Sequence, residues 1–319
     1  MPKKTIPILI SLIFLIVSFI LSSFLIQENA VYKKAKEQLA AELSYKNRFF
    51  NPEEWEPLEE HNADGFNYKD GQIDVNLYFG SSDKQKEKHN ELTTTIQTAE
   101  RAIQWRVFGL LISLLIYSLI MSAIYIYKKP PMVVLITLLS LSIICLYTGL
   151  FTPMLEIGAI ERDLDLGTIP IQKNVLGFTI DLTVQKKFEG DIYFYYQSKS
   201  IAQLIQLLFN QNNFLVGFSI LLFSVIFPLL KTCLMVYFVF RPQIEAKKWF
   251  KNIVLNLSKW SMADVFVVAI FLGFLAFGNL QAGVGTYSNI SIGLYFFFAY
   301  CMLSIISSML VKMPTEETF

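Results

Sequence analysis

Lys231 is the residue whose type and position most strongly suggest chemistry, because it interrupts an otherwise apolar run. Residues 214–240 read FLVGFSILLFSVIFPLLKTCLMVYFVF, and a helix needs about 20 apolar residues to cross a bilayer. A cation at membrane depth is costly, and such residues face a bundle interior, a partner group or a water path. The run therefore predicts a membrane helix with a polar function at Lys231.

Two residues that precede Lys231 indicate the geometry of the helix around it. Pro228 lies three residues earlier and removes a backbone donor, so we expect a kink there. Ser224 lies seven residues earlier, about two turns, so its side chain shares a helix face with the lysine. Arg241 follows Lys231 by ten residues, or about 15 Å of rise. The alternative, that Lys231 snorkels to the cytoplasmic headgroups, is at the limit of a lysine stem.

Asp264 is the natural counter-charge, because it is the one carboxylate of the apolar run SKWSMADVFVVAIFLGFLAF. Ser261 and Asp264 have the spacing of a capping box, so Asp264 also suits the N-terminus of a membrane helix. Trp260, beside them, fits an interfacial anchor. Capping and pairing are compatible. A Lys–Asp pair in a low-dielectric setting can exchange a proton when the helices shift, since burial disfavours both charges once they separate.

Other chemistry is not indicated. The sequence has no HExxH and no nucleophile elbow, so we expect no enzyme. The three cysteines lie in apolar runs without a CxxC, which argues against a zinc ribbon or a disulfide framework. We therefore expect no cofactor and no metal. A formal net charge of +1 implies no nucleic-acid partner.

The polar groups of the first long loop are expected to be exposed to solvent rather than to form a binding site. His61 and His89 are expected to be solvated loop histidines rather than metal ligands. A cluster of glutamates could bind cations, but such a run is usually a solvated face. The cluster comprises Glu53, Glu54, Glu56, Glu59 and Glu60.

Six apolar blocks predict six membrane spans. The first has too long an apolar core for a signal peptide and is expected to be retained. The blocks are Ile6 to Ile26, Val107 to Tyr127, Met132 to Met154, Phe214 to Phe240, Val265 to Phe277 with flanks, and Ile290 to Val311.

Lysines and arginines in the short loops set the orientation, because they favour the cytoplasmic side. They cluster before the first span, between the second and third, between the fourth and fifth, and after the sixth. All four places lie on one side if there are six spans, so both termini are expected in the cytoplasm. The two long loops, 28–105 and 155–212, then lie outside.

The long loops differ in their predicted structure. In 28–105, two stretches free of Gly and Pro predict helices that continue the first two spans, and IDVNLYF alternates like a strand. In 155–212, short β-branched and aromatic runs predict a small antiparallel sheet. An amphipathic helix follows, with Ile201, Leu204, Ile205 and Leu208 on one face.

The predicted fold class is therefore an all-α polytopic membrane protein of about six transmembrane helices. It carries a small antiparallel β element in its second extracytoplasmic loop. Two domains are expected: a transmembrane hairpin over 1–130, with a partly helical outer domain, and a four-helix module over 131–319.

Three motifs resemble a known family. Trp260 to Ala269, WSMADVFVVA, is similar to the signature of the paraquat-inducible protein A (PqiA) family. SVIFPLLK, from Ser224 to Lys231, and FTPMLEI, residues 151–157, resemble two further elements of that family in the expected order. Residues 131–312 thus resemble one complete four-span module. Residues 1–130 are not covered, and the zinc-ribbon cysteines of two-module members are missing here.

The resemblance implies a component of the bacterial inner membrane that traffics lipid between membranes. Its implied partners are phospholipids and a periplasmic protein with MCE (mammalian cell entry) domains. Ser224, Lys231 and Asp264 match the family's polar positions within the bundle. The alternative is a scaffold or envelope-stress sensor without transport, which uses the outer part of 1–130 to dock partners.

Overall fold

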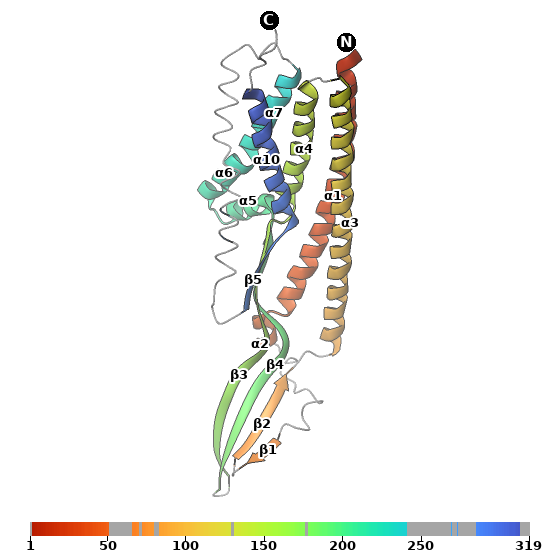
Figure 1. The fold of residues 1–319 in the computed structure, drawn as a ribbon. Helices are drawn as coiled ribbons and strands as arrows, with labels where there is room; N and C mark the ends of the chain where they lie inside the picture. The colour runs from red at the N-terminus through yellow and green to blue at the C-terminus, as the bar shows by residue number, and fades with distance from the viewer. Residues whose placement is uncertain are drawn as a thin grey trace.

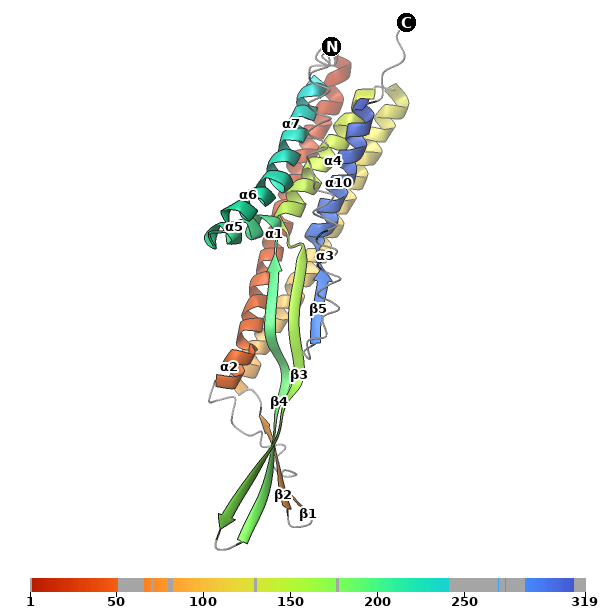
Figure 2. The same ribbon diagram turned by 90° about the vertical axis from the view of Figure 1, so that its left-hand side faces the viewer.

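A computed structural model gives the fold as a bundle of long helices from which a narrow β-sheet extends (Figure 1). Most of the helices run along one direction, and the sheet continues beyond one end of the bundle (Figure 2). The structure describes residues 2–50, 66–69, 72–79, 83–128, 131–175, 178–240, 269, 273 and 285–312.

Five helices among the described residues are long and apolar enough to cross a membrane. They confirm five of the predicted spans, and the chain is a multi-pass membrane protein. The remaining predicted span, Val265 to Phe277, lies outside the described residues except for Ala269 and Gly273. The helices are α1 (Pro2–Glu42), α3 (Asp83–Lys128), α4 (Pro131–Phe151), the continuous α6 (Phe214–Leu221) to α7 (Phe227–Phe240), and α10 (Ile292–Lys312).

The helices α1 and α3 are much longer than a bilayer requires. They contain 41 and 46 residues, or about 60–70 Å each at 1.5 Å per residue, against a hydrocarbon core of about 30 Å. Trp105 on α3 is 74% exposed, as in an interfacial aromatic belt. Arg106 beside it pairs with Glu28 of α1 at 3.9 Å. Beyond this level the helices continue as the predicted helical pair.

Among the residues that the structure describes, the sheet has five strands in the order β1-β2-β4-β3-β5. The predicted antiparallel element is confirmed as the β3–β4 hairpin, and IDVNLYF forms most of β2. The sheet is larger than predicted, because β5 joins β3 and β2 pairs in parallel with β4. The strands are β1 (Phe66–Lys69), β2 (Gln72–Phe79), β3 (Leu155–Val175), β4 (Phe178–Lys199) and β5 (Gly285–Ile290).

A short backbone corner connects the sheet to the bundle where α4 ends. The Met154 N–H donates to the Lys199 carbonyl at 3.2 Å, and the Met154 carbonyl accepts from the Ser291 N–H at 3.0 Å. The Pro153 carbonyl accepts from the Gly293 N–H at 2.9 Å. These bonds fix the ends of β3 and β4 against the first turn of α10. The corner therefore sets where α10 enters the bundle.

The predicted amphipathic helix is confirmed as α5 (Ile201–Asn210). Ser200 caps it in a capping box with Gln203, which satisfies the first backbone donors. Ile201 and Ile205 are buried against the bundle, as the spacing predicts. The helix α5 thus lies between the end of β4 and the start of α6.

Hydroxyl groups join the N-terminal helices to each other and to α4. Ser11 on α1 lies 2.7 Å from the Tyr117 hydroxyl on α3, and Ser22 lies 2.9 Å from the Thr148 hydroxyl on α4. Membrane helices associate through such hydrogen bonds and close packing rather than through the hydrophobic effect. These contacts attach the 1–130 hairpin to the module.

The helices α4 and α10 are in close contact at Gly149. A Cβ atom placed there would lie 2.8 Å from the Phe297 backbone nitrogen, so only glycine fits without displacing α10. Gly109 on α3 has no heavy atom within 4 Å of the corresponding position. Gly149 and Gly109 therefore form a matched pair of positions for substitution.

We predict that Gly149→Ala destabilises the protein by about 1–3 kcal/mol, because α10 must move. Gly109→Ala should be neutral or stabilising by up to about 1 kcal/mol, since alanine restricts the unfolded chain. Thermal unfolding of the purified protein in mild detergent measures both. Equal effects of the two substitutions would contradict the close α4–α10 contact.

Candidate functional site

Lys231 on α7 is buried within the bundle, with 5% of its surface exposed. Its ammonium group donates to the Ser304 hydroxyl at 2.7 Å and to the Ser304 carbonyl at 3.1 Å, both on α10. The side chain therefore reaches across to the neighbouring helix rather than toward the headgroups. Hydrogen bonds to a charged group are worth about 1.5–3 kcal/mol, comparable with the about 2.5–3.5 kcal/mol that a lysine at the bilayer centre costs.

The Ser304 carbonyl collects several side-chain donors. Besides Lys231, it accepts from the Ser307 hydroxyl at 2.9 Å and from the Ser308 hydroxyl at 2.8 Å. All three serines are buried. Because a carbonyl oxygen has two lone pairs, these donors share one acceptor. The result is a compact polar cluster in which Lys231 supplies the positive charge.

The helix that carries Lys231 departs from α-helical geometry just before Pro228. Residues Leu222–Ile226 form a π-helical turn, and such turns occur often at functional sites. Ser224, within that turn, is buried, as are Pro228 and Lys231. The Pro228 carbonyl accepts from the Thr232 hydroxyl at 2.9 Å. The kink at Pro228 stays a prediction, and the π-helical turn is the observed irregularity.

Three predicted site residues lie outside the described part of the chain. They are Asp264, Trp260 and Ser261. The pairing of Lys231 with Asp264 and the capping and anchoring roles therefore stay predictions.

An apolar pocket of about 340 Å³ lies beside the corner that joins the sheet to the bundle. Met154, Ile201 and Leu204 form part of its wall. Ala269 and Gly273, the two described residues of the predicted fifth span, also line the pocket. The lining is mainly apolar, which favours a hydrocarbon group over a charged ligand.

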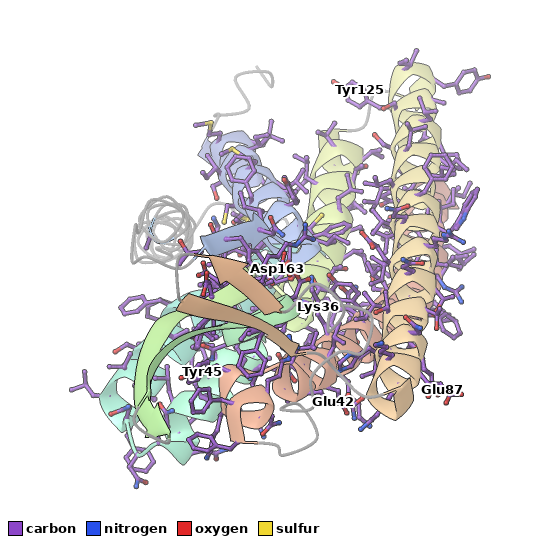
Figure 3. All side chains as sticks on the ribbon, turned by 90° about the horizontal axis from the view of Figure 1, so that it is seen from below. Lys36, Glu42, Tyr45, Glu87, Tyr125 and Asp163 are labelled. Atoms are coloured by element: carbon purple, nitrogen blue, oxygen red, sulfur yellow. The ribbon has the colours of Figure 1, made fainter. Side chains whose placement is uncertain are left out.

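A second charged cluster joins α1 to the base of the sheet. Lys36 on α1 forms an ion pair with the buried Glu156 of β3, and it lies between α1 and the strands when the molecule is viewed from below (Figure 3). Lys36 also donates to the Tyr32 hydroxyl at 2.8 Å and lies over the Tyr196 ring. Burial raises the pKa of the Tyr196 hydroxyl, and the Glu156 carboxylate raises it further, so this tyrosine stays neutral.

Sequence reasoning did not secure Ser304 and did not assign Lys36 or Glu156. Ser304 is one of three serines in the last span, and isolated membrane serines usually bond their own backbone. Glu156 lies within the FTPMLEI motif, residues 151–157, just after the predicted third span. A carboxylate directly after a predicted span was therefore a usable signal for a partner cation.

The comparison with protein families supports the resemblance in the sequence. Residues 190–315 match the model of the paraquat-inducible protein A family. That segment contains both Lys231 and Ser304, so the polar cluster lies wholly inside the matched part. A search of the curated proteins and a search of the solved structures gave no match to the chain.

We predict that Ser304→Ala lowers the free energy of unfolding by about 1–3 kcal/mol, because Lys231 loses a partner while it stays buried. In the Lys231→Met background, the same substitution should have little effect. The double-mutant cycle, measured by thermal unfolding in detergent, isolates the pair. Additive effects of the two substitutions would mean that the contact contributes nothing to stability.

Proposed function

We propose that this chain is a membrane subunit of a lipid-trafficking system in the bacterial inner membrane. In this proposal it handles phospholipid together with a periplasmic MCE-domain partner, and it is not an enzyme. The observation that carries the proposal is Lys231, a cation buried in the segment that matches the family model and hydrogen-bonded across to α10. A cation that served anchoring alone would lie at the headgroups.

The chemistry of the site suits a step that moves helices against each other. Separating Lys231 from Ser304 leaves an ammonium group in a low-dielectric setting, which favours its neutral form. A carboxylate that comes close favours the charged form again. In the proposal Asp264 is that carboxylate, and exchange of a proton between the two accompanies lipid movement.

The extracytoplasmic parts offer a route for an apolar cargo. The pocket beside Met154 and Ile201 opens where the sheet leaves the bundle. The strands β3 and β4, of 21 and 22 residues, can reach about 70 Å at 3.3 Å per residue. A pocket at the base of a long sheet supports a role in which the chain passes an apolar cargo to a partner away from the membrane.

The arrangement of the helix ends supports the proposed orientation. The start of α1 and the end of α10 lie at one end of the bundle, and the sheet extends from the other (Figure 1). With the basic loops on the cytoplasmic side, both termini are cytoplasmic and the sheet is periplasmic.

A scaffold or sensor is the second candidate, and one observation favours it. The N-terminal hairpin is linked to the sheet by several contacts, among them the Lys36–Glu156 ion pair and the pairing of β2 with β4. A partner that moves the outer ends of α1 and α3 would thus move the sheet as well. Such a protein would bind envelope partners without transferring lipid.

We predict that Lys231→Ala and Asp264→Ala each abolish transfer of a fluorescent phosphatidylethanolamine from liposomes containing the chain to acceptor liposomes with the partner. Both variants should insert into the membrane at wild-type levels. The exposed Lys34 of α1 provides the matched control, and Lys34→Ala should transfer lipid normally.

Wild-type transfer by both variants would overturn the mechanism. Copurification of an MCE-domain protein with the wild-type chain, measured by mass spectrometry after mild detergent extraction, separates the two candidates. A chain that copurifies with other envelope proteins and transfers no lipid would support the scaffold.

A further inference from the structure

Two lysines meet one carboxylate where the N-terminal hairpin packs against the end of β4. On α1, the Lys33 ammonium lies 3.7 Å from Oε1 of Glu37. The Lys199 ammonium, at the end of β4, lies 3.9 Å from the same oxygen. Charge-assisted N–H···O bonds are about 2.7–2.9 Å long, so both contacts with Glu37 are longer than such a bond. These three side chains together carry one positive charge in excess.

Lys33 is held in position by a partner other than Glu37. The residue is buried, and its ammonium donates to the side-chain carbonyl of Gln203 on α5. Gln203 is itself fixed, because the same oxygen accepts from the Ser200 backbone N–H in the capping box. The Glu37 side chain, in contrast, is 42% exposed. An incoming anion can therefore replace the Glu37 carboxylate while Lys33 keeps its place.

The apolar pocket of about 340 Å³ includes Lys199 in its wall. Lys199 lies opposite Leu155 in the β3–β4 hairpin, so both side chains are on one face of the sheet. Ile157 and Gln197 form the next pair on that face, and both also line the pocket. A lysine can pack its apolar stem along such a wall while its charged end lies at the rim. The pocket therefore combines an apolar interior with a cation at its edge.

The two lysines lie at the level of the extracytoplasmic headgroups. The Lys199 carbonyl accepts from the N–H of Met154, which is the last residue of the predicted third span. Lys33 follows Ile26, the end of the first predicted span, by seven residues, or about 10 Å of rise. Its side chain tilts back toward the membrane, because helical side chains point toward the N-terminus. Headgroups occupy about 5–8 Å on each side of the hydrocarbon core, so a lipid phosphate lies within reach of both.

We propose that a phospholipid binds here, with its phosphodiester between the Lys33 and Lys199 ammonium groups and an acyl chain in the apolar pocket. The phosphodiester takes the place of the Glu37 carboxylate, and lysine ammonium groups bind phosphate as point charges. The inference rests on the proposed function for the use of this lipid as cargo. Lys199 belongs to the segment that matches the family model, whereas Lys33 belongs to the N-terminal hairpin. The hairpin thus supplies half of the headgroup contact.

Native mass spectrometry of the full chain from mild detergent tests the site with dioleoylphosphatidylglycerol, whose headgroup has no charge besides the phosphodiester. Lys199→Met keeps an apolar stem and should weaken binding of the first lipid about tenfold, because a contact with a charged group is lost. Glu37→Gln should instead tighten binding about two- to fivefold, since the competing carboxylate is removed. Lys34→Met, at an exposed position of α1, removes the same charge and should bind the lipid as the wild type does.

The opposite directions of the two changes decide the proposal. Wild-type affinity in Lys199→Met, or weaker binding in Glu37→Gln, overturns it. Dioleoylglycerol, which lacks the phosphate, should bind Lys199→Met and the wild type equally, and a loss there would overturn the headgroup contact. Inorganic phosphate alone should not raise Tm, and a rise equal to that given by the lipid would assign the lysines to a free anion instead. If the lipid binds as expected but none is transferred, the proposed function fails and the binding site stands.

Discussion

The charge of Lys231 is the constraint on which the bundle depends. An ammonium group in the membrane must have partners, and α10 supplies them through the hydroxyl and carbonyl of Ser304. The contact requires α10 to be held at one height and at one rotation. The backbone corner at Pro153 and Met154 fixes the start of α10, and the close approach at Gly149 fixes its distance from α4. The packing of α10 therefore places Ser304 within reach of Lys231, and the Lys231 contact in turn holds α10 in that position.

The junction between the N-terminal hairpin and the sheet contains a second charge, that of Glu156. It lies at the start of β3, two residues after the corner, and pairs with Lys36 of the N-terminal hairpin. Glu156 also faces Asn289 of β5 across the sheet, and β5 leads into α10. The end of β5 and the first part of α10 thus connect the strand beside Glu156 with Ser304.

Local patterns in the sequence predicted the helices, the β3–β4 hairpin and α5, because hydrophobic period and capping residues are local signals. The run around Lys231 predicted its burial as well. The parallel pairing of β2 with β4 was not predictable, since alternation gives a strand but not its neighbour. The role of Ser304 was not secured and the Lys36–Glu156 pair was missed for the same reason: each becomes a site only through a contact between distant segments. The predicted role of Asp264 lies outside the described residues.

Solid-state NMR in bilayers tests most directly whether Lys231 is held inside the bundle. Protein labelled with ¹⁵N at lysine Nζ and ¹³C at serine carbonyls gives one lysine signal that Lys231→Met removes. Our account predicts that this signal is dephased by the serine carbonyl carbon, because Nζ lies 3.1 Å from the Ser304 carbonyl oxygen. It also predicts no dephasing by lipid phosphorus. Dephasing by phosphorus without dephasing by serine would mean that Lys231 snorkels to the headgroups, which would contradict the account.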